Sequence, residues 1–401
     1  MHGWKYLFQP TKIVFLKYLY SMKPIYYFLI ICASLSATMK AYAQQDYILS
    51  AKKSNGICLI ETPYGKWRFS TFPNGIVKTI FTPADSEKNE QISDAVIANE
   101  SQEKASIKYN KGQATISWEH SGKIILSKYG VKYNLQSSAI VEISNTHYSN
   151  EERGLHFSLQ PGEKIFGLGE RSLPMNRRGY KLPLYNNPWY GYSTDADALN
   201  FSVPFILSNK NYALLLDNPS KGYVDIGKTD PSEMKYAVIS GALSFYIIPG
   251  NDYNKILSHY SMLTGTQPLP PRWAMGNFLS RFGYNSEAQA KDILNKMKSD
   301  SVPADAIIFD LFWFGDSIKN TMGNLSWVNQ KAWPDPKKMV ADFKKEHIKT
   351  ILITEPFFLK SSLNYHDSRN YHAVDSLGYP FVLTDFYFGY GGLIDIFRND
   401  A

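Results

Sequence analysis

Three short segments in the last third of the chain place charged side chains beside aromatic ones. Asp310 stands before Leu311–Trp313, Glu355 stands before Pro356–Phe358, and a third segment is Arg281–Tyr284. Carboxylates accept hydrogen bonds from sugar hydroxyls, and flat aromatic rings cover the C–H faces of a sugar ring. These residue types in this pattern therefore predict a site for a carbohydrate.

Two carboxyl groups are also what the hydrolysis of a glycosidic bond requires. From residue types alone, Asp310 and Glu355 are the candidate pair, because each closes an apolar, strand-like run. The alternative is that Asp310 binds a sugar hydroxyl and Glu355 has a structural role. The pattern leaves both interpretations open.

Strand-like and helix-like segments alternate from residue 272 to the end of the sequence. In chain order we expect a strand Trp273–Leu279, a helix Glu287–Lys298 capped by Ser286, a strand Ala306–Phe309, a helix opening at Asp335–Pro336, a strand Lys349–Ile353, a weaker helix and a strand Phe381–Thr384. This alternation, with apolar strands, predicts a parallel sheet. Asp310 and Glu355 would then lie at the same edge of that sheet.

The turn after the first of these strands distinguishes between two candidate folds that contain a parallel sheet. A doubly wound, nucleotide-binding sheet usually has a glycine-rich turn there, whereas Ser280–Tyr284 is aromatic and basic. This favours the first part of a (β/α)8 TIM barrel, the catalytic barrel, over residues 272–401. Only three to four strand–helix units are present where a closed barrel has eight, so we expect the barrel to be incomplete at the C-terminus.

Residues 46–255 have a different pattern, with short strand-like runs punctuated by turn residues such as Asn74–Gly75 and Ser121–Gly122. Many strands without a helical period predict an N-terminal β-sandwich domain. Residues 256–271, which end in the proline-rich stretch Gln267–Pro271, are expected to form a linker.

Two other motifs in this domain have residue types that occur in ligand-binding loops. Phe166–Arg171 lacks the third glycine and the Lys-Ser/Thr ending of a phosphate loop, so we expect a tight turn. The polar, aromatic run Tyr185–Tyr192 is expected to be a loop that either lines a carbohydrate site or packs over the domain junction.

The basic charge of the chain comes mostly from its first 43 residues. They carry five lysines and no acidic residue; without them the 43 basic residues fall to 38 against 36 acidic ones, and the net charge falls from +7 to +2. A basic surface for nucleic acid is therefore not indicated. The apolar run Ile25–Ala33 and the small residues Ala41 and Ala43 predict a signal peptide over 1–43 and export to the periplasm or the extracellular space.

The two cysteines carry little functional signal. Cys32 could be lipidated, but the bulky Ile31 before it disfavours a lipoprotein anchor. Cys58 would be the single cysteine left after cleavage, and its apolar neighbours predict a buried, inert thiol. The sequence shows no cysteine–histidine spacing typical of structural zinc, and no cofactor or metal is predicted.

Several motifs together resemble glycoside hydrolase family 31, over Asp46 to the last residue. They occur in the order of that family and are Phe166–Glu170, Pro204–Phe205, Leu269–Gly276, Ser280–Tyr284, Phe309–Trp313, Trp333–Pro336 and Gly392–Asp395. Met322–Trp327, Ile353–Phe357 and Asp385–Gly389 look most like the bacterial α-1,4-transglucosylase branch, the oligosaccharide 4-α-D-glucosyltransferases. The resemblance implies a retaining enzyme that acts on α-glucosides or α-xylosides.

The resemblance also implies roles for single residues. Asp310 matches the acid that binds sugar hydroxyls in subsite −1, which removes it from the candidate catalytic pair. Leu311 and Phe312 match positions near the boundary of subsites −1 and +1. Phe282 matches an aromatic at the pocket edge, Ile353 an apolar pocket wall, and Phe388 or its neighbour Tyr387 a position that is often tryptophan. Many members have Asp or Asn where this chain has Glu355, which weakens a role of Glu355 as a ligand.

In the family, the aspartate nucleophile follows soon after the segment that resembles Leu393–Asp395, and the aspartate acid/base lies further on. The resemblance therefore implies that both lie beyond Ala401, that the 401 residues contain no catalytic residue, and that this portion is inactive alone. The expected partner is an α-linked oligosaccharide. The alternatives are a non-catalytic α-glucan-binding pseudoenzyme that retains Asp310 and the aromatic residues, and a purely structural module.

Overall fold

The computed structural model describes residues 47–84, 94–149, 151–186, 191–317, 319–384 and 386–400. The expected signal peptide and Cys32 lie outside these residues. The chain divides into two units, Met1–Thr266 and Gln267–Ala401.

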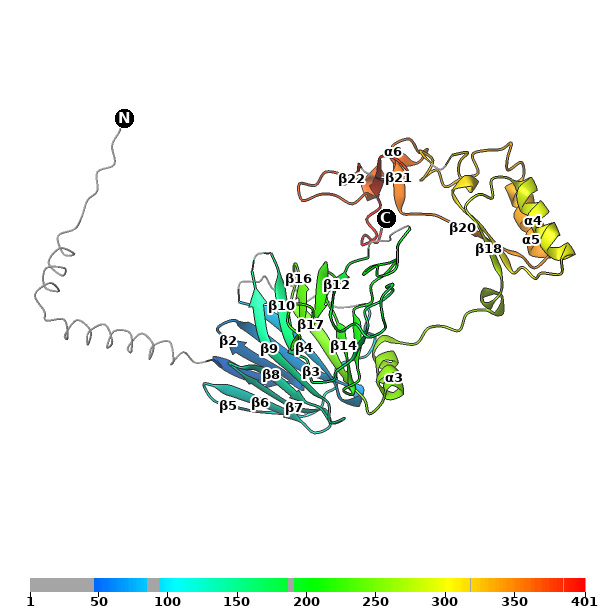
Figure 1. The fold of residues 1–401 in the computed structure, drawn as a ribbon. Helices are drawn as coiled ribbons and strands as arrows, with labels where there is room; N and C mark the ends of the chain where they lie inside the picture. The colour runs from blue at the N-terminus through cyan, green and yellow to red at the C-terminus, as the bar shows by residue number, and fades with distance from the viewer. Residues whose placement is uncertain are drawn as a thin grey trace, which may run out of the picture. The chain divides into compact units, whose positions relative to one another are not determined.

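The first unit contains two antiparallel sheets (Figure 1). The eight-stranded sheet has the order β1-β2-β3-β4-β17-β14-β13-β11, with bounds β1 Ser50–Ser54, β2 Ile57–Thr62, β3 Gly65–Phe72, β4 Ile76–Pro83, β17 Leu243–Pro249, β14 Tyr212–Leu216, β13 Phe205–Ser208 and β11 Ile165–Gly167. The nine-stranded sheet has the order β12-β15-β16-β10-β9-β8-β7-β6-β5, with bounds β12 Tyr180–Leu184, β15 Gly222–Ile226, β16 Glu233–Val238, β10 Arg153–Ser158, β9 Ile140–Tyr148, β8 Gly130–Asn134, β7 Gly122–Ser127, β6 Gln113–Trp118 and β5 Ala105–Tyr109.

One hydrophobic core joins the inner faces of these two sheets. Trp67 and Phe245 from the first sheet and Tyr133 and Phe157 from the second are buried in the same cluster. The alternation of buried and exposed residues along strands such as β6 explains this packing, because neighbouring side chains of a strand point to opposite faces. The expected β-sandwich is thus present. Cys58 is fully buried in it, and burial raises the pKa of its thiol to about 12.

The range 256–271, expected to be a linker, instead begins within a helix. Helix α3, Tyr253–Thr264, starts at Asp252, whose side chain accepts a hydrogen bond from the backbone N–H of Lys255. Ile256 and Leu263 are buried against strands β14 and β17, on the outer face of the eight-stranded sheet. The linker prediction overlooked a helical period, since Tyr253, Ile256, Leu257, Tyr260 and Leu263 stand at i, i+3, i+4, i+7 and i+10. Burial of this side against the sheet stabilises the helix.

The Phe166–Arg171 segment forms a turn after β11, as expected. Gly169 has a φ of +90°, and a Cβ atom there would lie 2.6 Å from the carbonyl oxygen of Phe201. The glycine is therefore explained by close backbone packing and needs no ligand. The Tyr185–Tyr192 loop lies partly outside the described residues.

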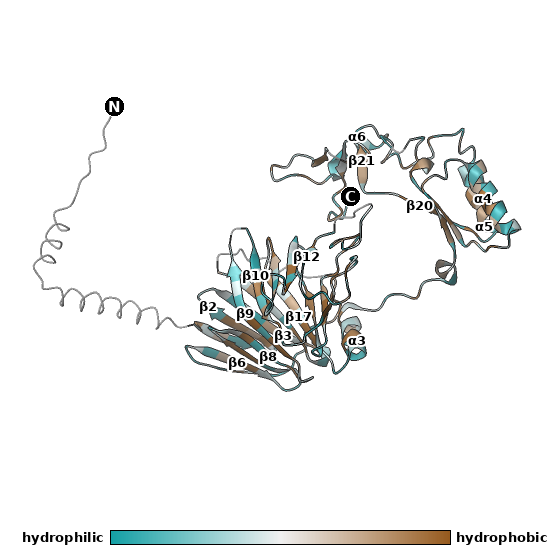
Figure 2. Ribbon diagram, in the orientation of Figure 1, coloured by the Kyte–Doolittle hydropathy of each residue, from teal (hydrophilic) through white to brown (hydrophobic). Residues whose placement is uncertain are grey.

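The second unit contains a parallel sheet, β18-β19-β20, formed by Phe278–Ser280, Ala306–Phe309 and Lys349–Leu352. Helix α4, Glu287–Ser299, and helix α5, Pro336–Lys345, each have an apolar and a polar side (Figure 2). Ala290 of α4 and Met339 of α5 are buried in one cluster with Phe309. The expected caps are present, since the side chains of Ser286 and Asp335 accept hydrogen bonds from the backbone N–H groups of Gln289 and Lys338.

The expected last strand does not extend this parallel sheet. Val382–Leu383 forms β22, which pairs antiparallel with β23, Gly391–Leu393; β23 also pairs with β21, Phe357–Leu359. The weaker helix is the short α6, Tyr365–Ser368. The described residues therefore contain the start of a parallel strand–helix fold and no closed barrel.

A buried carboxylate ties three parts of the sandwich together and gives a stability prediction. Glu163 is 2% exposed, and its carboxylate accepts hydrogen bonds from the Ser208 hydroxyl (2.5 Å), the Tyr212 hydroxyl (2.7 Å) and the Gln160 N–H (2.8 Å). Tyr212→Phe should lower the free energy of unfolding by about 1.5–3 kcal/mol, because a buried charged acceptor loses a donor. Urea denaturation measures this.

Tyr109→Phe on β5 is the matched control, because Tyr109 is 55% exposed. The control should change the free energy of unfolding by no more than about 0.5 kcal/mol. Equal effects of the two substitutions would contradict the assigned role of Glu163.

Candidate carbohydrate-binding site

The candidate site lies at the carboxyl edge of the parallel sheet in the second unit. Phe309 pairs with Leu352, and the N–H of Ile353 donates to the carbonyl oxygen of Phe309 at 2.9 Å. Asp310 follows directly after β19, the central strand. Parallel pairing therefore brings Asp310 and Ile353, which are 43 positions apart in the sequence, to the same edge.

Asp310 is half-buried and is held at the start of a 3₁₀ turn, Leu311–Trp313. Its Oδ1 atom accepts a hydrogen bond of 2.7 Å from the backbone N–H of Leu311. Within the described residues, its Oδ2 atom accepts no hydrogen bond. One carboxylate oxygen thus fixes the local backbone, and the other is available to a ligand hydroxyl.

Two indole rings hold the backbone on either side of Asp310. The Nε1–H of Trp333 donates to the carbonyl oxygen of Phe312 at 2.9 Å, and that of Trp313 donates to the carbonyl oxygen of Ile353 at 2.8 Å. Both rings are buried, and they contact Trp327 at centroid distances of 4.9 Å and 5.5 Å. Trp313 is therefore a buried positioning residue rather than one of the aromatics expected to cover a sugar ring, and Trp333 had no signal beyond its resemblance motif.

Two phenylalanine rings lie next to each other at this edge. Phe282, after β18, and Phe312, after β19, have ring centroids 6.0 Å apart in an edge-to-face arrangement. Phe282 is 57% exposed and Phe312 is partly exposed. The structure therefore brings together two of the predicted aromatic residues, and an exposed ring is available for contact with a ligand.

Glu355 lies close enough to Asp310 for their charges to interact. Burial, and then the negative charge of Asp310, raise the pKa of the Glu355 carboxyl. Removal from water and a neighbouring negative charge both favour the uncharged form of a carboxyl group.

The other predicted site residues differ in how buried they are and in what they contact. Leu311 is 3% exposed and its side chain packs into the core of the second unit, so its contact with Asp310 is through its backbone N–H. Ile353 is partly exposed beside Asp310. Tyr284 is 4% exposed and packs edge-to-face on Phe309, which makes it a core residue.

Phe388 is partly buried and packs against the same core. Its ring contacts among the described residues are with Phe386 at 5.2 Å and Tyr387 at 5.1 Å, rather than with Phe282 or Phe312. The structure therefore does not bring Phe388 into the aromatic pair, and Tyr387, at 62% exposed, is the more accessible of the two neighbours.

The described residues contain no group of three His, Cys, Asp or Glu side chains that could hold a metal ion. Among the same residues, no helix has the length and apolar character needed to cross a membrane.

Comparisons with known proteins agree with the architecture of both units. Residues 61–225 match the glycosyl hydrolase 31 N-terminal galactose mutarotase-like domain, and residues 267–401 match the glycosyl hydrolases family 31 TIM-barrel domain. The chain belongs to glycoside hydrolase family 31. It comprises the N-terminal domain of that family and the start of its TIM-barrel domain.

Relatives within family 31 include enzymes of two reaction types. Alpha-glucosidase 2 of Bacillus thermoamyloliquefaciens is 26% identical over 202 residues, which are 49% of this chain and 25% of that protein. The isomaltosyltransferase of Sporosarcina globispora is 24% identical over 238 residues, or 54% of this chain and 22% of that protein. The matched region thus spans about a quarter of the length of these relatives.

Among solved family 31 structures, the Flavobacterium johnsoniae dextranase in complex with isomaltotriose superposes with a TM-score of 0.78. The match covers 89% of this chain and 45% of the dextranase chain, at 21% sequence identity. This likeness establishes the shared fold.

The raised pKa of Glu355 predicts a pH-dependent stability change at the candidate site. A carboxyl group whose pKa is higher in the folded than in the unfolded protein destabilises the fold increasingly as pH rises from the unfolded to the folded pKa. Glu355→Gln removes this ionisation. It should therefore raise the melting temperature at pH 7 and change it little at pH 4, as thermal unfolding at the two pH values would show.

Asp310→Asn is the companion variant, because it keeps Glu355 and removes the neighbouring charge. It should move the titration of the Glu355 carboxyl to lower pH, as followed by carbon-13 NMR of labelled glutamate. An unchanged titration would contradict the interaction with Asp310, whereas a Glu355→Gln gain that is equal at both pH values would contradict the raised pKa of Glu355.

Proposed function

We propose that this chain is the N-terminal part of a retaining family 31 enzyme that acts on α-glucosidic bonds of oligosaccharides in carbohydrate metabolism. The observation that supports this proposal most strongly is Asp310, which follows the central parallel strand with one carboxylate oxygen open to a ligand. The exposed Phe282–Phe312 pair lies at the same sheet edge.

In this proposal Asp310 accepts hydrogen bonds from hydroxyls of the sugar bound in subsite −1. Phe312 and the backbone of Leu311 lie at the boundary to subsite +1, Phe282 covers the pocket edge, and Ile353 supplies an apolar wall. Phe388 is assigned to the pocket through the family resemblance alone. We assign none of these residues a catalytic role.

The reaction proposed for the whole protein is a double displacement. A carboxylate attacks the anomeric carbon while an acid protonates the departing glycosidic oxygen, which leaves a covalent glycosyl–enzyme intermediate. Water or the hydroxyl of an acceptor sugar then attacks from the face that the leaving group occupied, so the α configuration is retained. The nucleophile and the acid/base are proposed to lie beyond Ala401, and the 401 residues alone should cleave no α-glucoside.

The role of Asp310 can be tested by oligosaccharide binding to the 401-residue chain. Calorimetry with maltotriose and isomaltotriose should show binding that Asp310→Asn weakens by about tenfold or more, because a charged acceptor contributes more than a neutral one. Asp316→Asn is the matched control, since Asp316 is exposed and six residues further along, and it should leave binding unchanged.

The catalytic proposal needs the longer protein. Proton NMR of the first sugar released from maltotriose should show the α-anomer, and the products should reveal whether water or sugar is the acceptor. Turnover with inverted configuration would overturn the proposed mechanism. Binding to the longer protein without turnover would instead support the non-catalytic α-glucan-binding alternative.

We also propose that residues 1–43 direct export of the protein. Edman sequencing of the protein secreted by a bacterial host should then begin at Gln44. Recovery of the chain with its first 43 residues intact would contradict the proposed cleavage.

A further inference from the structure

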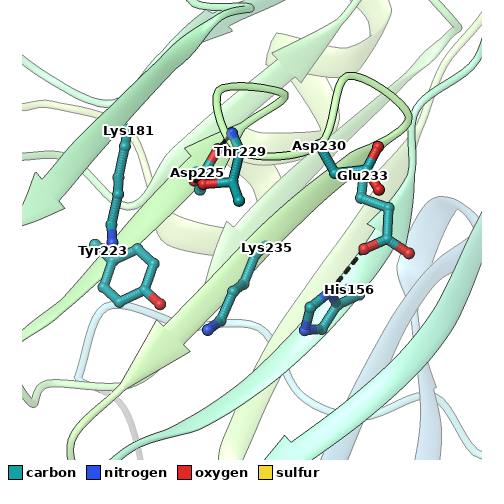
Figure 3. A pocket seen from close by; sticks show the side chains of 8 residues that line it. All are labelled: His156, Lys181, Tyr223, Asp225, Thr229, Asp230, Glu233 and Lys235. Atoms are coloured by element: carbon teal, nitrogen blue, oxygen red, sulfur yellow. Dashed lines mark hydrogen bonds and ion pairs between the residues drawn. The ribbon is translucent and has the colours of Figure 1, made fainter.

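A group of polar side chains in the first unit lies on the outer face of the nine-stranded sheet. It surrounds a cavity of about 360 Å³ (Figure 3). The lining residues come from β10, β12, β15, β16 and the loop before β16: His156, Lys181, Tyr223, Asp225, Thr229, Asp230, Glu233 and Lys235.

Most of these groups are already bound to one another or to nearby backbone. Asp225 accepts hydrogen bonds from the N–H groups of Lys228 and Thr229, and Asp230 accepts from the N–H and hydroxyl of Ser232. The ammonium group of Lys181 lies 4.1 Å from the ring centroid of Tyr223 (Figure 3). The cavity therefore borders a network of side chains whose polar groups already have partners. His156 connects this network to a second histidine.

His156 belongs to a continuous chain of four side chains. Its Nδ1 atom lies 2.8 Å from Oε2 of Glu233, and its Nε2 atom lies 3.2 Å from Nδ1 of His147. The Nε2 atom of His147 lies in turn 2.9 Å from Oε1 of Glu152. Three contacts at hydrogen-bonding distance thus join four side chains in the order Glu233, His156, His147 and Glu152.

Counting the protons in this series of four side chains gives the charge of the histidine pair. A carboxylate only accepts hydrogen bonds, so both outer contacts need an N–H from a histidine. The central contact between two ring nitrogens needs one more N–H. Two neutral imidazoles carry two N–H groups between them, so three hydrogen bonds require one additional proton and a single positive charge on the pair.

We propose that His147 and His156 form a proton-sharing pair that links β9, β10 and β16 through three hydrogen bonds only in its singly protonated state. Without the extra proton, the two imidazoles have only two N–H groups for the three contacts, so at one contact a nitrogen lone pair faces an acceptor. With two extra protons, two N–H groups oppose each other at the central contact. Either change removes one hydrogen bond from the chain.

The backbone leaves room for this arrangement at one position. Gly154 of β10 stands directly opposite His147 of β9, and a Cβ atom on Gly154 would lie 2.2 Å from Cε1 of His147. Any other residue at position 154 would displace the imidazole. The glycine therefore permits a ring position that the proposal requires.

Charged groups from every neighbouring element face the pair. Burial is the main cause that lowers the pKa of His147, and the nearby ammonium group of Lys235 lowers it further. A hydrogen bond from Lys235, first among several causes, lowers the pKa of Glu152 to about 2, and Tyr223 also donates to Glu152 at 3.1 Å. On the other side, the Ser144 hydroxyl donates to Glu233 at 2.7 Å.

Two further charged groups complete the surroundings of the pair. The charge of His156 contributes to lowering the pKa of Asp230, after the stronger effect of the hydrogen bonds from Ser232. Lys181 lines the same cavity from β12. The positive charges of Lys181 and Lys235 oppose a second proton on the histidine pair, whereas Glu152, Glu233 and Asp230 favour the first.

The pair predicts a stability maximum in pH. Unfolded histidines titrate independently near pH 6.5. The folded pair favours the singly protonated state over both others, so its contribution should be greatest near that pH and should fall on the acidic and the alkaline side. Losing one hydrogen bond should change the folding equilibrium constant about fivefold on each side.

Nitrogen-15 NMR of the histidine-labelled full chain tests the proposal directly, with EDTA present to exclude bound metal. At pH 6.5 the spectrum should show three N–H protons on the two imidazoles. Above this pH the pair should lose its one extra proton and become neutral, and below it the pair should bind a second extra proton. Two imidazoles that titrate independently, each through a single step, would overturn the proposal even if no variant folds.

A double-mutant cycle supplies the second test. In thermal unfolding from pH 5 to pH 9, the stability maximum should disappear in His147→Gln, in His156→Gln and in the double variant, with the double effect much smaller than the sum. His120→Gln is the matched control, because His120 is exposed in the same domain, and it should keep the maximum. Additive effects of the two substitutions would contradict a shared proton.

Discussion

The candidate sugar site depends on the parallel hydrogen bonding of β19 to its neighbours on both sides. Ala306–Phe309 pairs with β18 through one edge and with β20 through the other, so the carboxyl ends of three strands meet at one edge. This pairing places Asp310, Ile353 and the segment Arg281–Tyr284 together although they are distant in the sequence. The site would not exist if β19 paired antiparallel, because the strand ends would then lie at opposite edges.

Local interactions then refine what the strand pairing places. The Trp313 and Trp333 indoles bond the carbonyl oxygens of Ile353 and Phe312, which fixes the backbone on both sides of Asp310. A buried indole N–H is costly to leave unpaired, so each ring also restricts the backbone that satisfies it. The aromatic residues of this segment thus divide into two groups: tryptophans that hold the backbone, and phenylalanines that remain accessible to a ligand.

The sandwich domain uses polar groups in a different way. Glu163 is buried and fully bonded within the domain, and the pair His147–His156 is bonded at its surface between two carboxylates. Both features connect strands that are distant in the sequence. A polar group that links strands in this way stabilises one register of a sheet, because a shifted strand would leave the group unpaired.

Much of the molecule could be predicted from its sequence, for reasons that are local. Alternating burial predicts the sandwich strands, the caps Ser286 and Asp335 predict where two helices begin, and the apolar runs that end at Asp310 and Glu355 predict the parallel sheet. Helix α3 was also predictable from its sequence, because its apolar residues follow a helical period, and the linker prediction overlooked that period. The pairing of Val382–Leu383 with β23 had no such signal, since a two-residue strand has no pattern of its own.

The sequence by itself determined which residues stand at the strand ends and, through several ordered motifs, the family to which the chain belongs. The tertiary structure decided which of those residues are accessible: Leu311 and Tyr284 are buried, Phe282 and Phe312 lie together, and Phe388 packs away from them. It also decided that two histidines nine positions apart touch each other. These outcomes depend on the distances between segments that are far apart in the chain, and residue types and spacing do not specify those distances.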